Sequence, residues 1–124
     1  MDINIDFDGT VVTHNYPYIG KDIGAIPVLK DLVENGHNLI LFTMRSGKQL
    51  QDAVNWFKDN DIILYGIQSN PTQHLWTKSP KSYAHLMIDD SALGIPLIYD
   101  KEISDRPFVN WNKVKDILYN MEVL

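Results

Sequence analysis

The chain has 124 residues, of which 44% are hydrophobic and 22% charged, a composition typical of one globular domain spanning residues 1–124. It has no cysteine, which excludes disulfides and thiolate zinc sites. No apolar run is long enough for a membrane helix and no signal-peptide pattern opens the chain, so we expect a soluble cytoplasmic protein without a membrane partner. The net charge of −5 argues against an extended nucleic-acid interface.

Strand and helix patterns alternate along the chain. Short apolar runs predict strands, and apolar residues at helical spacing predict helices. The expected elements are a strand at residues 3–6, a polar loop at 13–22, a helix from Pro27 to the stop at Gly36, a strand at 38–43, a helix at 46–60, strands at 62–67, 86–88 and 96–99, and a final helix after Asn110. This alternation predicts an α/β protein with a central, mostly parallel sheet covered on both faces.

Acidic and hydroxyl side chains follow the expected strands. Asp6 ends the first expected strand and Asp8 follows it, and Asp89 and Asp90 come after the strand at residues 86–88. Thr43 ends the strand between them in the chain. Because ligands of such folds bind beyond the carboxyl ends of the strands, we expect these side chains to meet there. Paired carboxylates can bind a divalent cation and divide nucleophilic and acid–base roles.

The order of these groups resembles the haloacid dehalogenase (HAD) superfamily of phosphotransferases, over nearly the whole chain. The matching segments are Asp6-Phe7-Asp8-Gly9-Thr10, Leu41-Phe42-Thr43, a lysine before the last core strand, and Met87-Ile88-Asp89-Asp90. The resemblance implies a Rossmann-like three-layer sandwich. For the lysine we prefer Lys81, which stands just before the strand, and Lys78 stays open as the alternative.

The resemblance implies a Mg²⁺-dependent phosphatase that hydrolyses phosphate monoesters through an aspartyl-phosphate. Asp6 would attack phosphorus, and Asp8 would protonate the leaving group and then activate water. Thr43 and the lysine would stabilise the transferring phosphoryl group. The expected metal ligands are Asp6, Asp89 and the main-chain carbonyl of Asp8, with Asp90 holding a metal-bound water; the expected substrate-binding residues are Thr43, Arg45 and Lys81. Arg45 is otherwise an ordinary solvated arginine.

Members of this superfamily usually carry a cap domain, but too few residues lie between Thr10 and Pro27 for one. The chain therefore resembles the capless, minimal type. Such members either accept bulky or macromolecular substrates or close the site with a neighbouring subunit. The sequence therefore leaves open whether this chain forms a homo-oligomer. Residues 13–22 are the local candidate for a lid, and His14 lies there within reach of a substrate. A phosphorylated small molecule and a phosphorylated macromolecule are both open as substrates.

Other functions fit parts of the pattern. A non-catalytic phosphate- or metal-binding module on the same fold is the main alternative. A response-regulator receiver domain also places acidic groups, a threonine and a lysine around Mg²⁺, but its lysine comes after the threonine near the end, whereas here Asp89 and Asp90 follow the lysine. A divalent-metal nuclease is disfavoured by the acidic charge. An Asp-x-Asp-Gly sequence can also be a simple turn.

Overall fold

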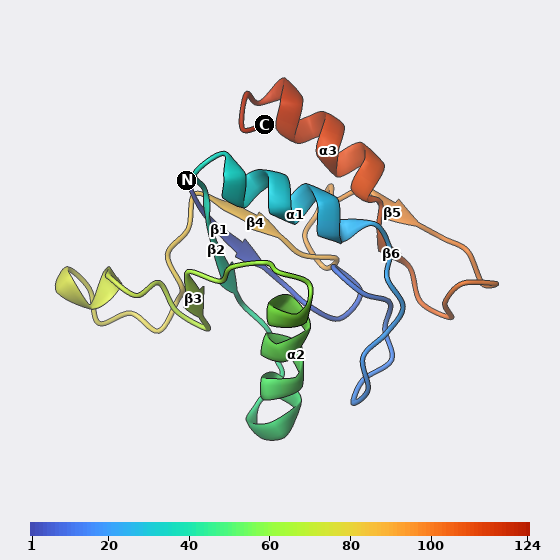
Figure 1. Cartoon of the computed structure of the whole chain (residues 1–124), viewed down its shortest axis with the longest axis horizontal. Helices are drawn as coiled ribbons and strands as arrows, with labels where there is room; N and C mark the ends of the chain where they lie inside the picture. The colour runs from blue at the N-terminus through green and yellow to red at the C-terminus, as the bar shows by residue number, and fades with distance from the viewer.

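A parallel sheet of four strands lies at the centre of the protein, with the helices around it (Figure 1). The computed structural model describes residues 1–124. The strand order β3-β2-β1-β4 makes β1 and β2 central and leaves β4 at an edge. Ile5 pairs with both Leu41 and Ile88, so β1, β2 and β4 end at the same level. The strands are β1 (Asp2–Ile5), β2 (Asn38–Leu41), β3 (Gly66–Ile67) and β4 (Leu86–Ile88).

Three amphipathic helices cover the hydrophobic face of the sheet, and their apolar stripes join it in one core of 20 buried residues. They are α1 (Ala25–Glu34), α2 (Gly47–Asp59) and α3 (Trp111–Asn120). Helix α3 lies beside α1 (Figure 1). Helix α2 packs its Phe57 ring 6.1 Å from that of Phe7, just beyond β1. The side chain of Asn110 accepts a hydrogen bond from the Lys113 amide and so caps α3, as its sequence position indicates.

The other face of the sheet is polar near β1 and is covered by the segment 68–85 instead of an α-helix. Asp2 and Asn4 alternate with Ile3 and Ile5, so they point to this face. The segment includes the short 3₁₀ helix η1 (Gln73–Leu75). The α/β class, the central parallel sheet and the absence of a cap domain are confirmed. The architecture is compatible with a Rossmann-like three-layer sandwich, with this segment as the third layer.

Two strands differ from the sequence expectation. Only Gly66–Ile67 of the expected strand at residues 62–67 is paired. The short strand expected at 96–99 is β5 (Leu97–Ile98), which pairs antiparallel with an unexpected strand, β6 (Phe108–Val109), outside the main sheet. The Val109 amide donates to the Gly9 carbonyl, so this small hairpin lies against the turn after β1. No helix in the structure is both long and apolar enough to cross a membrane.

Candidate functional site

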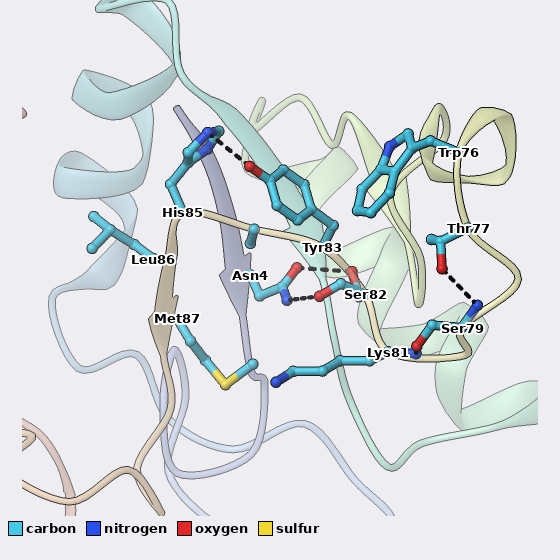
Figure 2. A pocket seen from close by; sticks show the side chains of 11 residues that line it. Asn4, Trp76, Thr77, Ser79, Lys81, Ser82, Tyr83, His85, Leu86 and Met87 are labelled. Carbon is cyan, nitrogen blue, oxygen red and sulfur yellow. Dashed lines mark hydrogen bonds between the residues drawn. The ribbon is translucent and has the colours of Figure 1, made fainter.

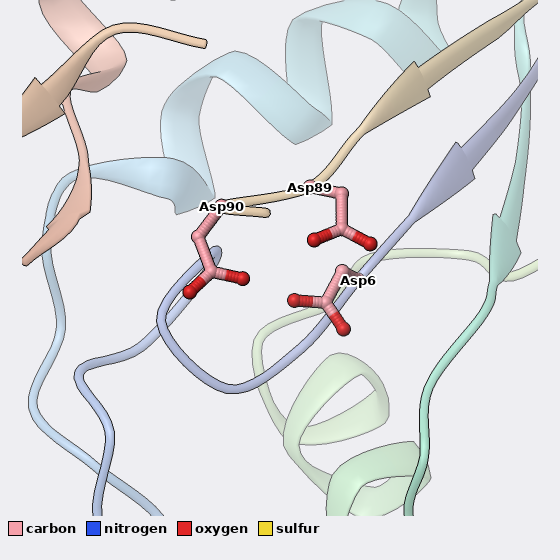
Figure 3. Close-up of side chains that lie close together, drawn as sticks. All are labelled: Asp6, Asp89 and Asp90. Carbon is pink, nitrogen blue, oxygen red and sulfur yellow. The ribbon is translucent and has the colours of Figure 1, made fainter. Parts of the chain in front are cut away.

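Three carboxylates meet where β1 and β4 end. The amide of Asp6 donates to the Ile88 carbonyl over 3.0 Å, which continues the pairing of the two strands and brings Asp6 beside Asp89. Oxygen atoms of Asp6, Asp89 and Asp90 all lie within 4.8 Å of one another, and their carboxylates converge in Figure 3. We call these three residues the acidic cluster. We expected Asp90 to contact a metal only through a water, but one of its carboxylate oxygens also lies within 4.8 Å of an oxygen of each of the other two.

Thr10 links the two halves of the acidic cluster. Its side chain is completely buried and its hydroxyl donates to Asp6 Oδ2 over 2.7 Å. The same hydroxyl oxygen accepts from the Asp90 amide over 2.9 Å. The indole of Trp111, at the start of α3, donates to the Thr10 carbonyl over 2.7 Å. Thr10 had no role assigned from the sequence, although it is the last residue of the motif that includes Asp6 and Asp8.

His14 reaches the acidic cluster from the loop at residues 13–22. Its Nε2 lies 2.8 Å from Asp90 Oδ2. Gly9 makes this approach possible, because a Cβ there would collide with His14 Nε2 and Asp90 Oδ2, and because its φ of +79° is a conformation that glycine adopts without strain. The structure therefore places the His14 imidazole in contact with the Asp90 carboxylate of the acidic cluster.

The electrostatics of the acidic cluster favour a cation. Burial, followed by the neighbouring charges of Asp89 and Asp90, raises the pKa of Asp6 to about 8, although the hydrogen bond from Thr10 acts in the opposite direction. No lysine or arginine forms an ion pair with the cluster. A set of three carboxylates without a lysine or arginine partner fits a hard divalent cation, which prefers oxygen ligands. The cluster could therefore hold a metal ion.

Asp8 is turned away from the acidic cluster and paired with Arg45. Arg45 Nε donates to Asp8 Oδ2 and its NH2 group to Asp8 Oδ1, both over 2.8 Å. The remaining guanidinium donors reach the carbonyls of Pro17, Tyr18 and Gln49. All five N–H groups of Arg45 are thus used inside the protein.

This arrangement corrects the expectation that Arg45 is a solvated arginine. A solvated arginine does not fit a residue that is 2% exposed. Substrate binding by Arg45 stays a prediction; in this structure its donors are used by Asp8 and by three main-chain carbonyls. The structure instead places Arg45 between Asp8 and the main chain of the 13–22 loop, whose Tyr16 ring lies 5.2 Å from the guanidinium carbon.

Thr43 lies just beyond β2, in a loop fixed by Gln68. The Thr43 amide donates to Gln68 Oε1 over 2.9 Å, and Gln68 Nε2 donates back to the Thr43 carbonyl over 2.7 Å. The Thr43 hydroxyl oxygen accepts from the Arg45 amide, which leaves its own proton free for another acceptor. The sequence did not indicate this role of Gln68. Its only signal there is its position directly after β3.

The two candidate lysines lie in the segment 68–85, and neither forms an ion pair. Both are exposed. The main chain of Lys81 is held by Ser79 Oγ and by Gln73 Nε2. Its side chain lines a cavity of about 550 Å³ over β1 and β4, drawn in Figure 2, and Lys78 does not. The structure thus places Lys81, but not Lys78, against the sheet.

The loop at residues 13–22 forms one side of the site. Thr13 and Lys21 hold its ends together through the bonds Thr13 N to Lys21 O and Lys21 N to Thr13 Oγ1. Its tip exposes the aromatic rings of Tyr16 and Tyr18, while Arg45 holds the tip's main chain from below. A lid role for this loop stays a prediction.

A solved structure of a conserved protein from Bacteroides thetaiotaomicron is similar to this chain. The two superpose with a TM-score of 0.80 and share 33% sequence identity, over 98% of this chain and 91% of that protein. No protein-family model matches the chain, and no curated protein matches it. The likeness covers the whole fold, including all the elements that surround the acidic cluster.

Proposed function

This chain belongs to the same family as the conserved Bacteroides thetaiotaomicron protein, and we propose its function from the geometry of the site itself. The proposed function is a Mg²⁺-dependent phosphatase that hydrolyses phosphate monoesters. One observation supports it most: Asp6 is half-buried beside two other carboxylates, and no lysine or arginine forms an ion pair with any of the three. The match of the surrounding residues to the HAD motifs supports it further.

The acidic cluster would supply the protein ligands. Asp6 and Asp89 would bind Mg²⁺, Asp90 would bind it directly or through a water, and the main-chain carbonyl of Asp8 is a further proposed ligand. When bound, the ion would cancel the repulsion between the Asp6 carboxylate and a phosphate dianion. His14 would hold Asp90 in place through their 2.8 Å contact.

Asp6 would form the new bond. A carboxylate oxygen attacks phosphorus, the bond from phosphorus to the leaving oxygen breaks, and an aspartyl-phosphate results. Asp8 gives a proton to the leaving oxygen and then takes one from the water that hydrolyses the aspartyl-phosphate. Since both oxygens of Asp8 accept from Arg45, one of these bonds must loosen when Asp8 carries the proton.

Two further side chains would stabilise the transferring group. The free hydroxyl proton of Thr43 can be donated to a phosphoryl oxygen. Lys81 would supply positive charge from the face of β1 and β4. Cytoplasmic location and a homo-oligomer stay predictions, as does the choice between small and macromolecular substrates.

The decisive experiment measures phenyl phosphate hydrolysis with and without Mg²⁺. We expect turnover that needs Mg²⁺ in the wild type and is lost in Asp6→Asn, because an amide cannot serve as the nucleophile. Asp59→Asn, an exposed site at the end of α2, is the matched control and should keep full activity. Full activity in Asp6→Asn would rule out the proposed mechanism.

The choice between the two lysines has its own test. Lys81→Ala should lower kcat/KM by roughly 100-fold, the scale on which single electrostatic donors act, because it removes the positive charge proposed to stabilise the phosphoryl group. Lys78→Ala, in the same segment and equally exposed, should change it little. A severe loss in Lys78→Ala with Lys81→Ala near normal would transfer the role to Lys78.

A phosphate- or metal-binding module without catalysis is the second candidate. It is favoured by the ion pair that engages both oxygens of Asp8, the proposed proton donor. Calorimetric binding of Mg²⁺ and inorganic phosphate, without turnover of any tested monoester, would select this reading.

A further inference from the structure

The face of the sheet that bears Asp6 also carries a built cavity. Side chains alternate along β1, so Asn4 and Asp6 point to the same face, as do Met87 and Asp89 beside them. Asn4 pairs in register with Met87, and both line the cavity of about 550 Å³. One side-chain repeat along a strand is about 7 Å, so the cavity floor ends next to the acidic cluster.

Figure 2 shows how this cavity is oriented. The side chains of Lys81 and Met87 approach each other on the side toward which the arrows of β1 and β4 point, which is the side of Asp6 and Asp89. Trp76, Tyr83 and His85 lie farther back along the strands. We call the cavity the aromatic pocket. Its cationic end thus faces the acidic cluster and its aromatic end lies away from it.

The wall of the aromatic pocket is fixed in place by buried polar side chains. Asn4 Nδ2 donates to the Ser82 carbonyl and Ser82 Oγ donates back to Asn4 Oδ1. Gln73 holds the main chain of Ser79, Lys81 and Tyr83 with three hydrogen bonds of 2.9–3.1 Å. The pocket is therefore preformed, and binding would cost little ordering of the protein.

The lining of the aromatic pocket is suited to a ring. Trp76 packs edge-on against Tyr83 with 5.3 Å between ring centroids, and Tyr83 against His85 with 5.4 Å. Trp76 nevertheless keeps 63% of its surface exposed. No carboxylate lines the pocket, although the chain is acidic, and Lys81 is its one lysine or arginine. An exposed aromatic group in a preformed hollow is typical of a binding site.

We propose that the aromatic pocket binds a planar aromatic ring in the leaving group of the phosphate monoester, with the phosphoryl group at Lys81 and Asp6. This inference rests on the proposed phosphatase function and names its substrate class. The ring packs against Trp76 and Tyr83.

The kinetic test compares phenyl phosphate with ethyl phosphate. Trp76→Leu should raise KM for phenyl phosphate roughly five-fold, the size expected for one lost aromatic contact, and KM for ethyl phosphate by less than about two-fold. Tyr99→Leu, an exposed aromatic outside the pocket, is the control and should change neither value. Equal changes for the two substrates, or none, would overturn the proposal.

A binding test separates this inference from the phosphatase proposal. Phenylphosphonate cannot be hydrolysed as a monoester, and its binding can be followed by the NMR signal of the Trp76 indole N–H, assigned by its loss in Trp76→Leu. We expect phenylphosphonate to shift this signal in the wild type and in Asp6→Asn, and ethylphosphonate to shift it much less. This result would support the ring site even if no turnover were found.

Two outcomes would reject the ring site. One is a Trp76 signal that does not move with phenylphosphonate. The other is a wild type that is dimeric by light scattering and a Trp76→Leu variant that is monomeric with both KM values unchanged, because the pocket would then belong to a contact with a second copy of the chain.

Discussion

Arg45 carries its charge into the protein interior, where its side chain is 1% exposed. A buried charge is tolerated only when it is paired and its donors are satisfied. Asp8 supplies the pairing, and three main-chain carbonyls accept the remaining N–H bonds. Two of these carbonyls belong to the 13–22 loop. One side chain therefore fixes both the orientation of Asp8 and the position of the loop beside it.

Arg45→Lys should lower the free energy of unfolding by about 3 kcal/mol, because one ammonium group cannot replace five fixed donors and Asp8 loses its two-point partner. Urea unfolding measures the change. A double-mutant cycle with Asp8→Asn isolates the pair, and we expect a coupling energy of at least about 1 kcal/mol. Additive effects of the two substitutions would contradict the role assigned to the ion pair.

At the scale of single residues, the sequence predicts which side chains lie at the ends of the strands. It does not predict which partners those side chains contact. Asp6, Asp89 and Asp90 follow directly from β1 and β4, because parallel neighbours bring their carboxyl ends together. Arg45 offers no such signal. Its partner Asp8 is distant in the chain, and whether its guanidinium turns inward depends on the path of the 13–22 loop.

Among the elements, the segment 68–85 is the one that sets this site apart from a sheet covered by helices. It contributes one 3₁₀ turn, yet it positions Lys81 and the aromatic pocket. Its order depends on Gln73, which is 6% exposed and makes hydrogen bonds to four main-chain groups of the segment. The segment is therefore held by polar side chains in place of an apolar stripe.

Gln73→Ala should lower the free energy of unfolding by about 2 kcal/mol, because it leaves buried main-chain groups without partners. Amide hydrogen exchange at Tyr83 should accelerate, since its amide donates to Gln73 Oε1. Gln73→Glu keeps this acceptor and loses the two bonds to carbonyls, so it should retain more protection at Tyr83. Unchanged exchange at Tyr83 in Gln73→Ala would show that other contacts hold the segment.

The packing of the elements also explains why the sequence prediction was wrong for two strands. Residues 62–67 have strand-like composition, but the Ile62 amide donates to the Phe57 carbonyl at the end of α2, so the chain joins β2 only later. Strand β6 has two residues, too short for any periodicity, and its existence depends on pairing with β5. Longer elements with full apolar stripes, such as α2 and α3, were predictable because their pattern is local.

For the whole molecule, the acidic cluster concentrates part of a net charge of −5 in a half-buried position. Without a cation, ionising Asp6 means creating a third negative charge beside Asp89 and Asp90. The folded protein therefore keeps a proton on Asp6 that the unfolded chain, with full solvation, releases at lower pH. Folding, protonation and metal binding are linked through this one carboxyl group.

The pKa of Asp6 lies at about 8 in the folded protein against 3.8 ordinarily, so its native form binds more protons than the unfolded form across that interval. The contribution of Asp6 to stability is thus fully present below pH 3.8 and is lost as pH rises to about 8. In EDTA, urea unfolding between about pH 5 and about pH 8.5 should show this fall in the wild type. Asp6→Asn, which has no proton to release there, should show a shallower dependence.

Mg²⁺ should reverse the loss, because it binds the ionised cluster of the folded protein in preference to the unfolded chain. At a concentration near 100 times its Kd, it should add about 2.7 kcal/mol to the free energy of unfolding of the wild type. The gain should be largest above about pH 8, where Asp6 no longer has to lose a proton on binding, and it should nearly vanish in Asp6→Asn. An equal gain in both proteins would place the stabilising ion away from the acidic cluster, and identical pH slopes in EDTA would mean that Asp6 is ionised in the folded, metal-free protein.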